Sequence, residues 1–149
     1  MEVPAGPTGP VDVGERQPRQ AASDPRAAIS AQWRSVVDVL DAVEAPSSAL
    51  LCTSSGFPLE AYGYAQADLV PAARVAGRTF ALRRATSAPS ADGVTVEVVV
   101  GTTLTVMAAI PSAHGDHLLS VTADGVSMPV LRAWTSHVAS QLGRVLAQA

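Results

Sequence analysis

Lysine is absent from this sequence, and all ten basic residues are arginines. Charged residues make up only 15% of the chain and the formal net charge is −3, so no basic surface is expected that would bind nucleic acid. Cys52 is the only cysteine, which excludes an internal disulfide bond. Because Cys52 falls in an expected strand, we predict that it packs as a small apolar side chain.

Long apolar runs are also missing. No stretch of about 18 apolar residues occurs, so no membrane-spanning helix is expected. Residues 1–20 lack the apolar segment of a secretory signal, which favours a cytoplasmic protein. The first 22 residues contain four prolines and three glycines without apolar periodicity, which predicts a disordered tail. Residues 23–149 are then expected to fold as one domain.

Two apolar stripes at helical spacing lie near the two ends of this domain. Asp24 is a natural N-cap and Pro25 a natural first residue of a helix, which Pro46 should end. The stripe of this helix consists of Ile29, Trp33, Val36, Val37, Leu40 and Val43. A last helix is expected from a cap at Ser127 to about residue 147. Its stripe consists of Leu131, Trp134, Val138, Leu142 and Val145.

Short apolar and β-branched segments between these helices predict strands at about 49–53, 59–64, 94–100, 104–110 and 117–123. The first two flank a turn at Ser54-Ser55-Gly56. Asp68 should cap a middle helix over about residues 69–85. Because short loops join antiparallel neighbours, the order α-β-β-α-β-β-β-α predicts an α+β fold. Its five-stranded antiparallel sheet would carry the first and last helices on one face and the middle helix on the other.

The middle helix and the third strand carry the signals for a partner. Few large side chains occupy the middle of this helix, which would let another backbone approach closely. Four of the ten arginines lie on it, namely Arg74, Arg78, Arg83 and Arg84. The third strand, VTVEVVV, has no proline or lysine that would block pairing at a sheet edge. Both features are better explained by a dimer than by a monomer.

Residues suited to catalysis or metal binding are few. His114, Asp116 and His117 lie close together, but no cysteine or third histidine is near, so we interpret them as a solvated loop rather than a metal site. Ser54 and Ser55 are better explained as turn-capping residues than as nucleophiles. No phosphate-binding loop occurs. We therefore predict a protein that is not an enzyme and has no catalytic, cofactor-binding or metal-binding residues.

The hairpin LLCTSSGFPLEAYG, the later hairpin VTVEVVVGTTLTVMAAI and the order of elements resemble the roadblock/longin-like (profilin-like) superfamily, specifically the bacterial roadblock (dynein light chain roadblock-type) domain proteins. The resemblance covers about residues 24–147, and Ser55 replaces the aspartate that commonly precedes the turn glycine. It implies a non-enzymatic homodimer or heterodimer in which the third strands pair across a two-fold axis and the middle helices lie side by side. It also implies a signalling role with a small Ras-like GTPase as partner, since some of these proteins act as co-GTPase-activating proteins.

The resemblance and the residues together give specific predictions. The predicted homodimer interface consists of Val94, Val96, Val98, Val100, Ala73, Ala76, Gly77 and Phe80. The predicted GTPase-binding residues are Arg74, Arg78 and Arg84. Two alternatives remain open. One is a small-molecule sensor domain, which a sizeable apolar pocket beside the sheet would favour, and the other is an assembly scaffold with no GTPase contact.

Overall fold

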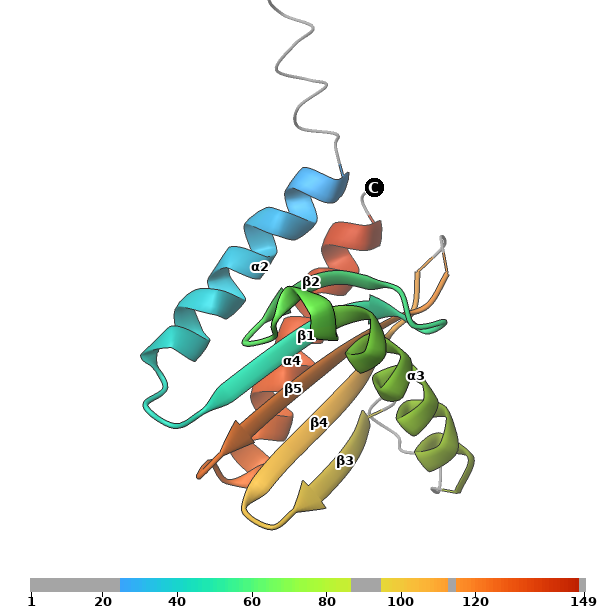
Figure 1. The fold of residues 1–149 in the computed structure, drawn as a ribbon. Helices are drawn as coiled ribbons and strands as arrows, with labels where there is room; N and C mark the ends of the chain where they lie inside the picture. Colours follow the sequence, from blue (N-terminus) through green and yellow to red (C-terminus); the bar gives the residue numbers. More distant parts are fainter. Residues whose placement is uncertain (1–24, 87–94, 113–114, 148–149) are drawn as a thin grey trace, which may run out of the picture.

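A computed structural model describes residues 25–86, 95–112 and 115–147. Helix α2 (Pro25–Ala42) is followed by β1 (Ser47–Thr53), β2 (Pro58–Tyr62), the 3-10 turn η1 (Gln66–Asp68) and α3 (Leu69–Thr86). Strands β3 (Thr95–Val100), β4 (Thr103–Ile110) and β5 (His117–Asp124) then lead to α4 (Met128–Ala147). The predicted order of elements is confirmed (Figure 1). The predicted tail over residues 1–22, the cap at Asp24, and also Val94 and His114 lie outside the described residues.

The five strands form one antiparallel sheet in the order β2-β1-β5-β4-β3. Strand β5 is central and is the most continuously buried, with Leu118, Leu119 and Val121 almost inaccessible to solvent. The β1–β2 hairpin turns through Gly56, whose φ of +97° favours glycine. Strands β2 and β3 form the two edges, which confirms the predicted edge position of β3.

Helices cover both faces of this sheet, in the predicted arrangement (Figure 1). On one face α2 and α4 pack against alternate strand residues such as Leu51, Val106 and Val121. On the other face α3 packs against the intervening residues, among them Leu50 and Cys52. Burial raises the pKa of the Cys52 thiol to about 11, which keeps it protonated at neutral pH. The prediction that Cys52 packs as a core side chain is confirmed.

The close packing of α3 depends on its small residues. Ala73 and Ala76 are buried against the sheet. A Cβ added to Gly77 would lie 2.9 Å from the carbonyl oxygen of Ser54, so only glycine fits there without a shift of the backbone. The backbone that approaches this helix closely at Gly77 is therefore that of the chain's own β1–β2 turn.

Candidate functional site

The side of α3 that faces away from the sheet combines apolar and basic side chains. Arg74, Val75, Arg78 and Leu82 recur at helical spacing, and we call these four residues the outer face of α3. Val75 is 59% exposed, and Leu82, about two turns farther along the same face of the helix, is 64% exposed. Both arginines are exposed as well. This combination suits contact with another protein surface.

The predicted interface residues lie partly inside the chain's own core. Ala73, Ala76 and Phe80 pack against the sheet, and they share this cluster with Val96 of β3. Val98 packs beside the same cluster. The role of these side chains in a dimer stays a prediction, and a partner would first meet the exposed residues around them.

Strand β3 presents an open main-chain edge. Gly101, with a φ of +63°, and Thr102 form a two-residue turn, so Val100 and Thr103 pair directly across the hairpin. Because hydrogen-bonded pairs alternate along an antiparallel ladder, the main-chain groups of Val96, Val98 and Val100 point toward β4. Those of the intervening residues Thr95, Glu97 and Val99 point away from the sheet, where a further strand could pair with them.

The last residues of β3 are also apolar and open to solvent. Val99 is 61% exposed and Val100 is 71% exposed. Nothing within the described residues blocks this end of the edge with a proline or a lysine. Nearer the middle of the strand, Glu97 forms an ion pair and hydrogen bonds with Arg132 of α4, on the face of the sheet opposite to α3. The free edge therefore has an apolar end and a charged middle.

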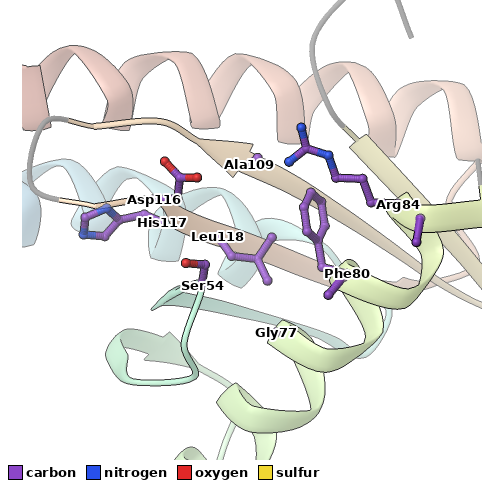
Figure 2. A pocket seen from close by; sticks show the side chains of 10 residues that line it. Ser54, Gly77, Phe80, Arg84, Ala109, Asp116, His117 and Leu118 are labelled. Carbon is purple, nitrogen blue, oxygen red and sulfur yellow. The ribbon is translucent and has the colours of Figure 1, made fainter. Parts of the chain in front are cut away.

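A pocket of about 480 Å³ opens between α3 and the sheet (Figure 2). Phe80, Leu118 and Ala109 give it apolar walls. Polar groups reach it from four places: Ser54 from the β1–β2 turn, Arg84 from α3, Asp116 from the segment before β5, and His117 from the start of β5. The backbone N–H of Ser54 donates to the carbonyl oxygen of Asp116 at 3.0 Å, which holds these two residues side by side at the pocket.

The three predicted partner-binding arginines do not form one cluster. Arg74 and Arg78 line a second, more polar pocket of about 370 Å³ together with Ser54 and Ser55. Arg84, nearly three turns after Arg74 on the same helix, lines the larger pocket instead. The structure thus separates the arginines of the outer face from the arginine of the larger pocket.

The predicted start of the fifth strand at His117 is confirmed, but the side chain of His117 is buried rather than solvated. It is the first residue of the central strand β5 and is only 8% exposed. Its Nδ1 lies 3.0 Å from the carbonyl oxygen of Gly115, which fixes the ring. Asp116, in contrast, is exposed as expected. Their adjacency in the sequence favours one loop for Asp116 and His117. In the structure, the central strand begins between them, so His117 is buried and Asp116 is exposed.

Groups for covalent or metal chemistry are not assembled among the described residues. The hydroxyls of Thr53 and Ser55 lie 2.9 Å apart, and the Thr53 hydroxyl accepts from the backbone N–H of Phe57 at 3.0 Å. Ser55 thus serves the turn, as predicted. Ser54 and His117 line one pocket, but no hydrogen bond joins their side chains there. Within residues 25–86, 95–112 and 115–147, no group of three metal-ligating side chains is found.

No helix in the described part of the chain has the length and hydropathy needed to cross a membrane. No model of a protein family matches the chain, and neither does any curated protein. Solved structures do match its fold.

A Roadblock/LC7 domain from Streptomyces avermitilis superposes with a TM-score of 0.54 at 20% sequence identity, covering 72% of this chain and 87% of that one. The gliding protein MglB from Thermus thermophilus superposes with a TM-score of 0.61 at 16% identity, covering 84% and 93%. A structure of MglB with a tetrameric arrangement gives 0.57 at 17% identity, covering 80% and 90%. The predicted roadblock/longin-like α+β fold is confirmed.

Proposed function

We propose that this chain, which has the fold of Roadblock/LC7 domain proteins, is a non-enzymatic dimeric regulator in the cytoplasm that binds a small Ras-like GTPase. The observation that carries the proposal is the outer face of α3, where exposed apolar and basic side chains lie together. Strand β3, whose outer edge pairs with no other strand of the described residues, contacts the same helix. The opposite face of the sheet is covered by α2 and α4.

Self-association through β3 is supported by its backbone and by its side chains. The outward main-chain groups of Thr95, Glu97 and Val99 would pair with the same strand of a second copy across a two-fold axis. The exposed Val99 and Val100 would then lose their contact with water. A related roadblock protein in place of the second copy would use the same edge.

A GTPase would contact the outer face of α3. Guanidinium groups donate several hydrogen bonds in a fixed geometry and suit the acidic and polar switch surfaces of small GTPases. Arg74 and Arg78 stand beside the exposed Val75, so charge and apolar area are available at one place. A two-fold dimer would present two copies of this surface.

The test is direct binding of the full-length chain to small Ras-like GTPases from the same organism, each loaded with GDP or with a GTP analogue. Arg78→Glu and Arg74→Glu should each weaken binding about tenfold or more, because the charge reversal replaces attraction by repulsion. Arg34→Glu is the matched control, since Arg34 is an exposed arginine on α2 at the other face of the sheet. The Arg34 variant should bind like the native chain.

Each variant is first checked for an intact dimer, so that loss of the dimer is not mistaken for loss of the GTPase site. Unchanged affinity in the α3 variants would move the site away from α3. If no GTPase binds the intact dimer, the assembly scaffold without GTPase contact replaces this proposal.

A further inference from the structure

The larger pocket beside α3 has the size and composition of a small-molecule site. Its volume of about 480 Å³ falls within the range of about 300–1,000 Å³ that is usual for such sites. Phe80 and Leu118 supply the apolar walls, and a few polar groups stand around them (Figure 2). This is the feature expected of the small-molecule sensor that the sequence left open.

Two opposite charges reach this one pocket. Arg84 comes from the last turns of α3, and Asp116 comes from the residue before β5. Figure 2 shows both side chains at the same pocket, on either side of Ala109. Within the described ranges, neither side chain forms an ion pair or a hydrogen bond, with the other or with any other residue.

With respect to the described residues, both charges are therefore available to a ligand. A guanidinium group holds a carboxylate through two parallel hydrogen bonds. A carboxylate in turn accepts hydrogen bonds from an ammonium group. Both side chains are exposed, so a ligand with only one charge would form one of these two contacts and leave the other group in water. The pair of charges thus selects a ligand that carries both signs.

We propose that the pocket binds a small zwitterion with an apolar body, of the class of short apolar peptides. Arg84 holds its carboxylate, Asp116 holds its ammonium group, and its side chains pack on Phe80 and Leu118. Because the two charges belong to separate elements that do not pair, a ligand whose own charges are separated fits better than one whose charges share a carbon atom. This inference is independent of the proposed GTPase partner.

The test uses the full-length chain and three matched probes in calorimetric titrations. Leucyl-leucine carries both charges, N-acetyl-leucyl-leucine lacks the ammonium group, and leucyl-leucinamide lacks the carboxylate. The expected result is saturable binding of leucyl-leucine, at least about tenfold tighter than either of the other probes, because each of those probes is missing one charge-assisted hydrogen-bonded contact.

Two variants test which residue of the pocket binds which charged group of the ligand. Arg84→Gln should abolish the preference for leucyl-leucine over its amide and leave the preference over the acetylated probe. Asp116→Asn should do the reverse. Arg78→Gln is the matched control, because Arg78 lies on the same helix but lines the other pocket, and it should leave all three affinities unchanged. Ala109→Phe should fill the pocket and remove binding of every probe, with an unchanged circular dichroism spectrum.

Equal affinity for the three probes would overturn the proposal. So would an absence of saturable binding at millimolar leucyl-leucine, or an Arg84→Gln variant that keeps the native preference for the free carboxylate. Since no GTPase is present in these titrations, their failure says nothing against the proposed regulator, and failure of the GTPase test leaves this pocket unaffected.

Discussion

The two faces of the sheet are packed in different ways. The face under α2 and α4 is filled with large side chains, such as Trp33, Leu40 and Leu142. The face under α3 is covered through Ala73, Ala76 and Gly77, and Phe80 is the largest side chain that α3 contributes to this core. A helix with small inward residues lies close to the sheet at its middle. It leaves a pocket at its end and carries its larger apolar residues outward.

This difference separates stability from interaction. Free energy of unfolding scales with the apolar area that leaves water, so the α2–α4 face supplies most of it. The α3 side buries less within the chain, and it keeps exposed the groups that a partner or a ligand could use. We infer that packing on the α2–α4 face of the sheet stabilises the fold, whereas the α3 side makes the contacts with partners and ligands.

The largest expected effect is a core deletion on the α2–α4 side. Leu142 is fully buried between α4 and the sheet, so Leu142→Ala should lower the free energy of unfolding by about 2–5 kcal/mol. Urea denaturation followed by circular dichroism measures this loss. The same measurement on Leu82→Ala, an exposed leucine of α3, should show a change within about 0.5 kcal/mol at concentrations where the chain is monomeric.

A smaller change in the free energy of unfolding is expected from replacing one helical glycine by alanine on each side of the sheet. Gly77→Ala places a Cβ 2.9 Å from the Ser54 carbonyl oxygen, so it should destabilise the chain by about 1–3 kcal/mol despite the better helix propensity of alanine. Gly143 of α4 is the control, because its Cβ would lie 3.6 Å from a methyl group of Ile110, an ordinary contact. Gly143→Ala should be neutral or stabilising by up to about 1 kcal/mol. Opposite results would contradict the packing described for α3.

The sequence predicts the elements of this fold because each depends on local chemistry. Proline positions, apolar stripes at helical spacing and the β-branched run before Gly101 all agree with one order of elements. The pairing of β1 with β5, which leaves β2 and β3 at the two edges, is seen only in the assembled sheet.

The site could be predicted only in part, since it depends on which element packs on which. The small residues of α3 indicate that another backbone segment packs closely against this helix, but the sequence does not identify that segment. In the structure it is the β1–β2 turn at Ser54, which approaches Gly77. The pocket joins Arg84 to Asp116, which are far apart in the sequence, so no spacing rule could find it. The predicted start of a strand at His117 was a usable signal. It could have indicated that His117 is buried while Asp116, which precedes the strand, is exposed.

The smallest effect on the fold is expected from a proline at the open edge. Val99→Pro removes an N–H that points away from the sheet, a position that an edge strand tolerates. Val98→Pro is the control, since it removes an N–H that points toward β4 and breaks the chain's own ladder. Thermal unfolding should therefore show Val99→Pro close to the native chain and Val98→Pro clearly less stable.

Sedimentation equilibrium of the native chain and of Val99→Pro tests the central claim, that contacts are made from the α3–β3 side, most directly. At micromolar concentration the native chain should have twice the chain mass of 15.2 kDa, and Val99→Pro should shift toward that single mass with its circular dichroism spectrum unchanged. A native chain that sediments as a monomer, or a Val99→Pro variant that dimerises as strongly as the native chain, would contradict the account.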